Sequence, residues 1–375
     1  MAQRSGAPVA TTRTPPVCVQ DLQRSAAARL APEVWDFITG GSGAETTLDA
    51  NRAALDRVAL VPRVLAGVEK ADTGARLVGT SAALPLAVAP MAYQRLLHPD
   101  GELATARAAA AARVPFAVST ISSSTLEEIA EAGATLWFQL YWLRDRGRVV
   151  ELIRRAEAVG CQALMVTVDV PVMARRLRDL RNEFTLPSWI RSANLEPDGP
   201  SAAHSHRPGE SAVATHTKNA FDATFGWPDL QWLREQTRLP LVIKGILDPG
   251  DAEQAVRLGA DAVVVSNHGG RQLDGALPSI TALPRVVEAV GGRCQVLMDS
   301  GVRSGTDILR ALALGADGLL IGRPVLWGLG TAGAEGVAEV LSLLRTELEE
   351  ALLLAGCADT AAARTLGTFV SGVPG

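Results

Sequence analysis

Short, continuous apolar runs recur along the chain, and each is followed by a turn and an amphipathic segment. Runs that are apolar throughout, rather than at alternate positions, are typical of parallel strands buried on both faces. The pattern predicts eight strands, at residues 84–90, 114–120, 136–142, 163–170, 241–245, 262–267, 295–301 and 318–322. It predicts helices between them at 101–112, 124–132, 146–159, 249–258, 280–290 and 304–314. Residues 19–39 are predicted to form one helix that ends at the glycines of segment 40–43.

Eight strands that alternate with helices predict an α/β fold of the (β/α)8 TIM-barrel class, with an open doubly wound sheet as the alternative. An internal repeat favours the barrel, because the segment from Leu241 matches the segment from Val296. Gly245 pairs with Gly301, and the LGAD of residues 258–261 pairs with that of 314–317. Successive units of a barrel would give one βαβ pattern twice in this way.

Two further segments define the expected domain organisation. Segment 171–240 contains no barrel strand, and its part at about 186–227 is rich in Pro, Ser, His, Gly and Asn, which predicts a lid loop after strand 4. Segment 188–225 is polar. Residues 1–17 have no apolar core of a signal peptide and are predicted to be a disordered leader. Residues 18–375 are predicted to form a single domain.

Composition excludes several functional classes. The 36 basic and 40 acidic residues give a net charge of −4, so nothing indicates nucleic-acid binding. The four cysteines lie far apart and form no C-x-x-C pair, which predicts a reduced, cytoplasmic chain. The longest apolar stretch, at residues 82–93, contains two prolines and is too short to span a bilayer, so no membrane association is expected.

The predicted strands end in polar residues, and barrels build their active sites at these ends. Lys244 follows a buried apolar strand, where an unpaired ammonium group is costly. It therefore either forms an ion pair with Asp299 or contacts a cofactor. His268 is the best candidate for a general base, with Asp169 on a neighbouring strand end. Arg176 and Arg271 could bind a substrate carboxylate.

A second group of residues follows strands 7 and 8, where barrels commonly bind phosphate. Gly301, Arg303, Gly322 and Arg323 predict an anion site for a phosphorylated cofactor or a sugar-phosphate substrate. The G-x-G-x-x-G at 328–333 does not directly follow a strand, so it is not interpreted as a dinucleotide site. His204, His206 and His216 form at most a weak metal candidate, because no Cys or carboxylate cluster joins them.

At these residues the chain resembles the FMN-dependent 2-hydroxy-acid oxidases and dehydrogenases, which include glycolate oxidase, lactate oxidase and mandelate dehydrogenase. The resemblance covers about residues 19–357. The segments that carry it are SNHGGRQLDG, FQLYW, TVDVP, LVIKG, DSGVRSGTD and IGRPV. Within the family, the chain is most similar to the actinobacterial 4-hydroxymandelate oxidases, through WDFITGGSG, APMAYQRLLHPDGE, RRLRDLRNEF and WFQLYWLRD.

The resemblance implies a role for each matching residue. His268 would be the base, oriented by Asp169, while Arg176, Arg271 and Tyr141 would bind the substrate. Lys244 would lie beside N1 and O2 of the flavin. The remaining contacts to FMN would come from Pro90, Met91, Ala92, Ser119, Gln139, Thr167, Ser266, Asp299, Gly301, Arg303, Gly322 and Arg323. This resolves the phosphate alternatives in favour of FMN.

Two positions depart from the glycolate oxidase pattern. Phe37 replaces a substrate-binding tyrosine, and Ile121 replaces a bulky tryptophan. With Met91 they would line a substrate pocket that suits an aryl group. The resemblance thus implies oxidation of an aryl 2-hydroxy acid, such as (S)-4-hydroxymandelate, with O2 as the acceptor, in the cytoplasm and in antibiotic biosynthesis.

Alternatives remain at this level. They are an oxidase or a quinone-linked dehydrogenase for lactate or glycolate, and a non-catalytic flavin-binding protein. The polar segment 188–225 favours an oxidase over a membrane-linked dehydrogenase. By analogy with the family, a homo-tetramer or octamer is expected.

Overall fold

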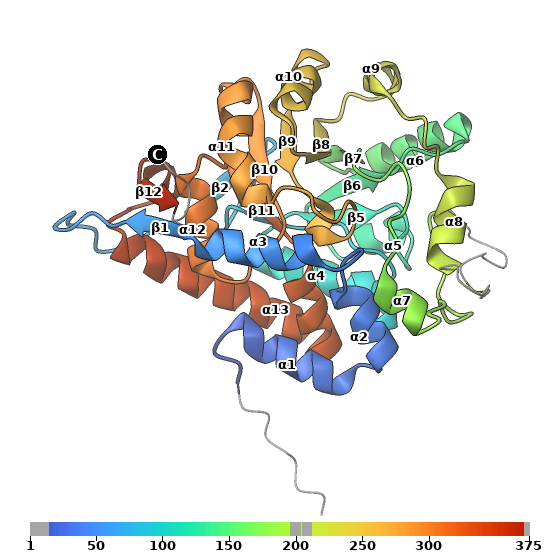
Figure 1. The fold of residues 1–375 in the computed structure, drawn as a ribbon, viewed down its shortest axis with the longest axis horizontal. Helices are drawn as coiled ribbons and strands as arrows, with labels where there is room; N and C mark the ends of the chain where they lie inside the picture. Colours follow the sequence, from blue (N-terminus) through green and yellow to red (C-terminus); the bar gives the residue numbers. More distant parts are fainter. Residues whose placement is uncertain (1–14, 196–203, 205–211, 371–375) are drawn as a thin grey trace, which may run out of the picture.

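Eight parallel strands close into a barrel in the computed structural model, which describes residues 15–195, 204 and 212–370 (Figure 1). They are β4 (Leu86–Val88), β5 (Phe116–Ser119), β6 (Leu136–Leu140), β7 (Ala163–Thr167), β8 (Leu241–Ile246), β9 (Ala262–Val265), β10 (Gln295–Met298) and β11 (Gly318–Ile321). The last strand pairs with the first, with Leu319 opposite Leu86, so the open-sheet alternative is wrong. Most predicted runs extend beyond the strand, because the chain leaves the sheet there to form the loops of the site.

The predicted helices surround this barrel. They are α4 (Gly101–Ala112), α5 (Leu126–Ala130), α6 (Arg146–Ala158), α10 (Pro249–Arg257), α11 (Ser279–Val290) and α12 (Gly305–Ala313). α13 (Arg323–Leu354) follows the last strand and packs on α1, α4 and α12. The helix predicted at 124–132 is shorter at both ends, and its first residue follows the N-cap Thr125 in a capping box. Thr125, whose backbone is extended, accepts a hydrogen bond from the amide of Glu128, and the Glu128 carboxylate accepts one from the amide of Thr125.

The predicted helix at 19–39 is two helices, α1 (Val19–Arg29) and α2 (Pro32–Thr39). Proline lacks an amide proton and disfavours a helical conformation of the preceding residue. Leu30 and Ala31 are accordingly extended, and Pro32 begins the second helix. The chain continues through α3 (Thr46–Asp56), whose residues contact the loop after β9. This N-terminal segment therefore covers part of the strand ends.

The two ends of the barrel are closed differently. At the N-terminal ends of the strands, a hairpin of β2 (Ala75–Leu77) and β3 (Thr80–Ala82) inserts Leu77 and Val78 into the barrel core beside Trp137. Next to it, β1 (Val58–Val61) pairs antiparallel with β12 (Gly367–Val370), and α14 (Thr360–Ala363) precedes β12. The opposite end, where the strands finish, carries the long loops and the cavity described below.

As predicted, the described part of segment 171–240 contains no barrel strand. It contains instead α7 (Leu177–Arg181), α8 (Ala212–Ala220) and α9 (Trp227–Gln236), so the lid is partly helical. The end of α8 is joined to the end of β6, because the amide of Asp222 donates to the carbonyl of Trp142 and its carboxylate binds Arg146 at 2.8 Å. Residues 196–203 and 205–211 of the lid, and residues 1–14 of the predicted leader, lie outside the described residues.

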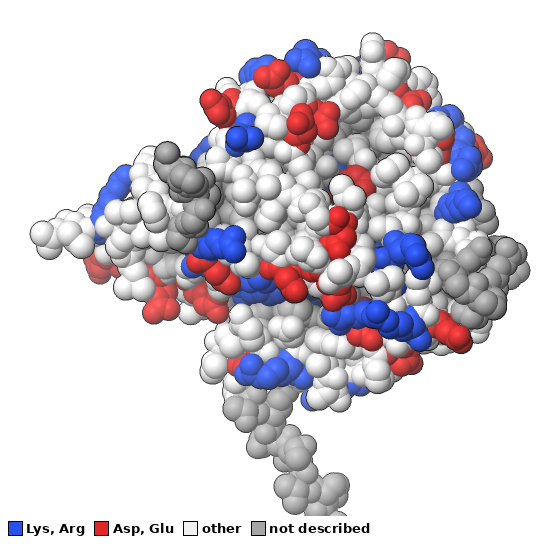
Figure 2. Space-filling model, in the orientation of Figure 1, with Lys and Arg blue, Asp and Glu red and all other residues white. Residues whose placement is uncertain are grey.

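Basic and acidic side chains are interspersed on the face shown in Figure 2, and neither kind forms a large patch there. None of the described helices is long and apolar enough to cross a membrane. All four cysteines are free thiols.

Candidate active site

A cavity opens at the C-terminal ends of the barrel strands, as predicted. Including the solvent at its mouth it measures about 1140 Å³, slightly above the range of ~300–1,000 Å³ typical of ligand sites. The predicted site residues that line it are Phe37, Pro90, Met91, Ala92, Ser119, Ile121, Tyr141, Thr167, Arg176, Lys244, His268, Arg271, Asp299, Gly301, Arg303, Gly322 and Arg323. Gln139, Asp169 and Ser266 do not line the cavity but contact residues that do.

His268 follows β9 in a single 3₁₀ turn, η3 (His268–Gly270). Its Nδ1 lies 3.0 Å from Oδ1 of Asp169, in the loop after β7. A carboxylate accepts, so Nδ1 carries a proton, and in the neutral imidazole Nε2 then has the lone pair. Burial favours the protonated form of Asp169, but His268, and then Lys244, lower the pKa of this carboxyl below its usual value. The pair is therefore an oriented imidazole beside a fixed negative charge.

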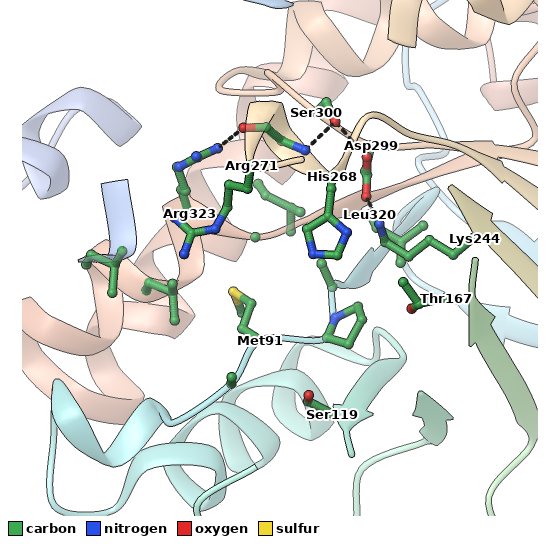
Figure 3. A pocket seen from close by; sticks show the side chains of 18 of the residues that line it. Met91, Ser119, Thr167, Lys244, His268, Arg271, Asp299, Ser300, Leu320 and Arg323 are labelled. Carbon is green, nitrogen blue, oxygen red and sulfur yellow. Dashed lines mark hydrogen bonds and ion pairs between the residues drawn. The ribbon is translucent and has the colours of Figure 1, made fainter. Parts of the chain in front are cut away.

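Lys244 forms the predicted ion pair with Asp299 and also lines the cavity, where its predicted contact with a cofactor stays a prediction. Its Nζ lies 2.8 Å from Oδ2 of Asp299 and donates a 2.8 Å hydrogen bond to Oγ of Ser266, while its side chain lines the cavity. Burial alone would lower the pKa of Lys244, but Asp299 and Asp169 raise it above its ordinary value. The cavity thus contains an ammonium group that is charged at neutral pH, which Figure 3 shows between Asp299 and Thr167.

Arg176 and Arg271 place two guanidinium groups at one side of the cavity. Burial, followed by Arg176 and Arg323, lowers the pKa of Arg271 well below its ordinary value, and burial also lowers that of Arg176. Nε of Arg176 is buried without a hydrogen-bond partner among the described residues, and no described acidic side chain forms an ion pair with either arginine. Two like charges held together in this way favour an anionic ligand between them.

Tyr141 lines the cavity near these arginines. Burial and the neighbouring Asp169 raise its pKa to about 12, so its phenol is a neutral hydrogen-bond donor. The ring of Phe221, from the lid, stacks on it with centroids 4.6 Å apart. The lid therefore contacts a predicted substrate-binding residue directly.

The residues predicted to form an anion site after β10 and β11, Gly301, Arg303, Gly322 and Arg323, line the same cavity. Burial, followed by the charge of Arg323, lowers the pKa of Arg303 to about 9. Burial, followed by the charge of Arg176, lowers that of Arg323 to about 10, and Nε of Arg323 is buried without a partner among the described residues. Gly301 has a φ of +91°, and a Cβ there would lie 3.1 Å from the backbone of Asn51. Two buried cations beside such a glycine turn fit a doubly charged phosphate group.

Between these charged groups lie polar residues suited to the edge of a heterocycle. Gln139 Nε2 donates to Oγ1 of Thr167 at 3.0 Å, and the side chain of Ser119 contacts Oε1 of Gln139. All three side chains are buried. With Lys244 they provide donors and acceptors along one line of strand ends. Together with the phosphate site and the volume of the cavity, this donor set fits FMN.

Three apolar side chains, Phe37, Ile121 and Met91, also line the cavity, and Figure 3 shows Met91 across the cavity from His268. The ring of Phe37 stacks on Phe184 with centroids 4.6 Å apart, and the guanidinium carbon of Arg271 lies 5.7 Å from the Phe37 ring. The cavity therefore combines apolar side chains with the arginine pair, and Phe37 adjoins Arg271.

Several contributors were missed from sequence. Asp179, buried three residues after Arg176, is charge-coupled to Arg176 and Arg271, and burial raises its own pKa. The i, i+3 spacing in α7 could have indicated it. Ser300 lies inside the segment DSGVR but was passed over. Phe184 and Phe221 carry no sequence signal, because their stacking depends on the path of the lid.

The weak metal candidate gains no support. No group of three or more His, Cys, Asp or Glu suited to a metal ion occurs among the described residues. His204 contacts the carbonyl of Ile190, His206 lies outside the described residues, and nothing is described of the His216 side chain.

Comparisons with known proteins agree with this geometry. The family model for FMN-dependent dehydrogenases matches residues 26–366. The chain is 53% identical to a 4-hydroxymandelate oxidase of Amycolatopsis orientalis, over 94% of this chain and 98% of that protein. It is 47% identical to an L-lactate oxidase of Nostoc sp., over 92% and 96%. A crystal structure of mandelate oxidase with (S)-4-hydroxymandelic acid superimposes with a TM-score of 0.93 at 52% identity, covering 96% of this chain and all of that one.

The resemblance inferred from the sequence is therefore confirmed, as are the enzyme class and the cofactor. A family model that spans nearly the whole chain matches, and the cavity is lined by cationic and polar side chains that fit FMN. The chain belongs to the FMN-dependent dehydrogenase family and is an FMN-dependent 2-hydroxy-acid oxidase.

Proposed function

We propose that this enzyme oxidises an aryl 2-hydroxy acid, (S)-4-hydroxymandelate or mandelate, to the 2-oxo acid, which is 4-hydroxybenzoylformate for the first substrate. The observation that carries the proposal is the lining of the cavity, which combines the arginine pair with the apolar side chains of Phe37, Ile121 and Met91. The 4-hydroxymandelate oxidase of Amycolatopsis orientalis, at 53% identity, supports the same assignment.

Arg176 and Arg271 bind the substrate carboxylate in this proposal, and the neutral phenol of Tyr141 donates a hydrogen bond to the substrate. Hydrogen bonds to charged groups contribute roughly 1.5–3 kcal/mol each. The site should therefore discriminate strongly against amides and esters. The aryl group then packs against Phe37 and Ile121, where its burial contributes ~25 cal/mol per Å² of apolar surface.

FMN would be held by the residues that the geometry brings together. Arg303, Arg323 and the backbone at Gly301 and Gly322 would bind its phosphate, and Asp299 its ribityl hydroxyls. Ser119, Gln139, Thr167, Lys244 and Ser266, with the segment Pro90, Met91 and Ala92, would surround its ring. When bound, FMN accepts two electrons from the substrate and passes them to O2, which becomes H2O2.

His268 takes a proton from the bound substrate through Nε2. In a hydride route this is the hydroxyl proton, and in a carbanion route it is the proton on C2. Asp169 stabilises the resulting imidazolium ion, because its charge lies 3.0 Å from Nδ1. Lys244 offsets negative charge that develops near it in the cavity.

A panel of 2-hydroxy acids with peroxide as the readout tests the proposal. We expect kcat/KM for 4-hydroxymandelate and mandelate to exceed that for lactate and glycolate at least tenfold, which requires about 1.4 kcal/mol of differential transition-state binding. Peroxide should form in air without an added acceptor. Equal efficiency with glycolate would disprove the aryl preference, and a need for an added quinone would indicate a dehydrogenase instead.

Ile121→Trp provides a matched variant, because it enlarges one apolar side chain of the cavity and leaves Arg176 and Arg271 unchanged. It should lower kcat/KM for the aryl acids while that for glycolate stays within about threefold of wild type. A uniform loss for all substrates would place the effect of Ile121 in folding or cofactor binding.

Other features remain proposals of the same kind. We infer a homo-tetramer or octamer, a cytoplasmic location, a role in hydroxyphenylglycine-type antibiotic biosynthesis, and a single domain over residues 18–375. Small-molecule 2-hydroxy acid and O2 are the expected partners, without nucleic acid or membrane.

A further inference from the structure

The backbone beneath the cavity is unusual at two adjoining loops. His268, Gly269 and Gly270 have φ values of +58°, +66° and +72° in succession, and Ser300, in the loop after β10, has a φ of +79°. Glycine adopts this left-handed region freely, whereas a serine there is strained. Such strain persists when the surrounding structure compensates for it, and it is commonly found at functional sites.

The Ser300 side chain joins the two loops. Its Oγ accepts a 3.0 Å hydrogen bond from the amide of Gly269 and donates a 2.8 Å hydrogen bond to Oδ1 of Asp299. Oδ2 of the same carboxylate lies 2.8 Å from Nζ of Lys244. Figure 3 shows these contacts as a chain of dashed lines from the backbone beside His268 to Lys244.

The chain of contacts closes on itself. Lys244 Nζ donates to Oγ of Ser266 at 2.8 Å, and the same oxygen accepts the amide of His268 at 3.0 Å. The peptide bond between His268 and Gly269 completes a ring, which we call the serine ring: Ser300, Asp299, Lys244, Ser266 and the His268–Gly269 backbone. The amides of His268 and Gly269 thus donate to serine hydroxyls rather than to a strand or helix partner.

The serine ring restrains the backbone at His268, whereas Asp169 contacts only the imidazole side chain. The hydrogen bond from Nδ1 to Asp169 orients the imidazole. The backbone of His268 and Gly269 is held by the two amide hydrogen bonds, together with the bonds that its carbonyls accept from the Arg271 amide and from Arg323.

We propose that Ser300 is a positioning residue for His268. Its hydroxyl connects the backbone beside His268 to Asp299, the partner of Lys244. The inference rests on the proposed role of His268 as the base.

Two substitutions at one site separate positioning from strain. Ser300→Ala removes the hydroxyl and keeps a side chain at positive φ, whereas Ser300→Gly removes both the hydroxyl and the strain. Thr331→Val is the matched control, because it removes a buried hydroxyl, one that contacts the carbonyl of Leu22 in a part of the fold distant in sequence from the ring.

The readout is the anaerobic rate of flavin reduction in the holoenzyme, with any 2-hydroxy acid that the wild type oxidises. We expect about tenfold slower reduction in both Ser300 variants, less than the ~10²-fold cost of a 1 Å misplacement. The substrate dissociation constant and the FMN dissociation constant should each stay within about threefold, and the isotope effect of 2-deuterated substrate should increase. Ser300→Gly should have a higher Tm than Ser300→Ala, and Thr331→Val should reduce the flavin at the wild-type rate.

Three results would overturn the inference. They are unchanged reduction in both variants, a rate that recovers with Tm in Ser300→Gly, and loss of FMN affinity that accounts for the slower rate. Failure of the proposed function is distinguishable, because it appears in the wild-type substrate panel, whereas this test compares variant with wild type on one substrate.

Discussion

Two successive units of the barrel, β8–α10–β9 and β10–α12–β11, share a local sequence pattern and a local backbone. Gly245 and Gly301 occupy matching positions, with φ values of +114° and +91°. Matching side chains, Asp248 and Ser304, accept hydrogen bonds from the first turns of α10 and α12. Near the second strand of each unit, Asp261 and Asp317 accept the amides of Leu241 and Val296, each at 2.8 Å. The repeat therefore specifies the scaffold of a unit.

The same two units differ in what surrounds them. Asp251 in α10 is exposed to solvent, whereas its counterpart Asp307 in α12 is fully buried and binds Arg52 at 2.6 Å and Arg310 at 3.0 Å. The second unit packs against α13, and α3 supplies Arg52. One aspartate is a surface residue and the other an anchor, because neighbouring helices cover only the second.

The strand ends differ in chemistry as well. The first unit contributes Lys244 and His268, and the second contributes Asp299, Ser300 and Arg323 to the same cavity. The comparison teaches that one scaffold presents the proposed base in one unit and the proposed phosphate site in the next. Variants at matched positions can therefore test this division of roles.

The largest expected effect separates the two roles. His268→Ala should slow flavin reduction by about 10³-fold or more, in line with the ~10²–10⁴-fold contribution of a general base, while FMN stays bound. Arg323→Ala should do the opposite and weaken FMN binding, because it removes a buried cation from the phosphate site. Stopped-flow reduction and FMN titration measure the two effects, and near-normal reduction in His268→Ala would remove this residue from the mechanism.

The matched aspartates should differ next most strongly. Asp307→Ala leaves two arginines without their buried partner and should lower the free energy of unfolding by about 3 kcal/mol. Asp251→Ala should leave Tm unchanged or slightly raised. Partial desolvation, followed by Asp248, raises the pKa of Asp251, so its charged form is disfavoured in the folded state at neutral pH. This cost decreases as the pH falls through the folded pKa and is absent below the unfolded pKa. Thermal unfolding at pH 7 measures both, and equal losses of stability would contradict the comparison.

Lys244→Met tests the cation of the first unit. Flavin reduction should slow by about 10²-fold, comparable to the loss of one preorganised electrostatic contact. The affinity for sulfite should fall together with it, since the adduct also places negative charge on the flavin near Lys244. Spectrophotometric titration with sulfite is the measurement. An unchanged sulfite affinity would place this ammonium group away from the flavin.

The matched glycines should give smaller and distinct effects. A Cβ at Gly245 would lie 2.6 Å from the side chain of Asp169, whereas one at Gly301 would lie 3.0 Å from Leu55 and 3.1 Å from Asn51. Gly245→Ala should therefore lower kcat about tenfold through the base pair, and Gly301→Ala should weaken FMN binding about tenfold, each within the range for a misplaced group. Steady-state kinetics and FMN titration distinguish them, and the same pattern in both variants would contradict the division of roles.

Local sequence predicted much of this molecule correctly. All eight strands and the six predicted helices between them follow from hydrophobic periodicity, with differences at element ends such as the start of α5. Periodicity did not predict α7, α8 and α9 after β7 or α13 after β11. The break between α1 and α2 could also have been predicted from Pro32, because the restriction that proline imposes is local. The apolar pattern continues on both sides of Pro32 and favoured one helix instead. The polar strand ends predicted the cavity, because parallel strands of a closed barrel finish on one face.

What the sequence by itself determined was the scaffold, the ring of polar strand ends and the family resemblance that assigned FMN. Only the tertiary structure decided how those residues are joined: His268 to Asp169 across 99 residues, Arg271 to the carbonyl of Gly40 across 231, and Ser300 to the backbone beside the base. It also decided which of two matching aspartates is buried. Periodicity and turn chemistry act over a few residues, whereas burial, charge coupling and side-chain hydrogen bonds depend on which distant segments the closed barrel brings into contact.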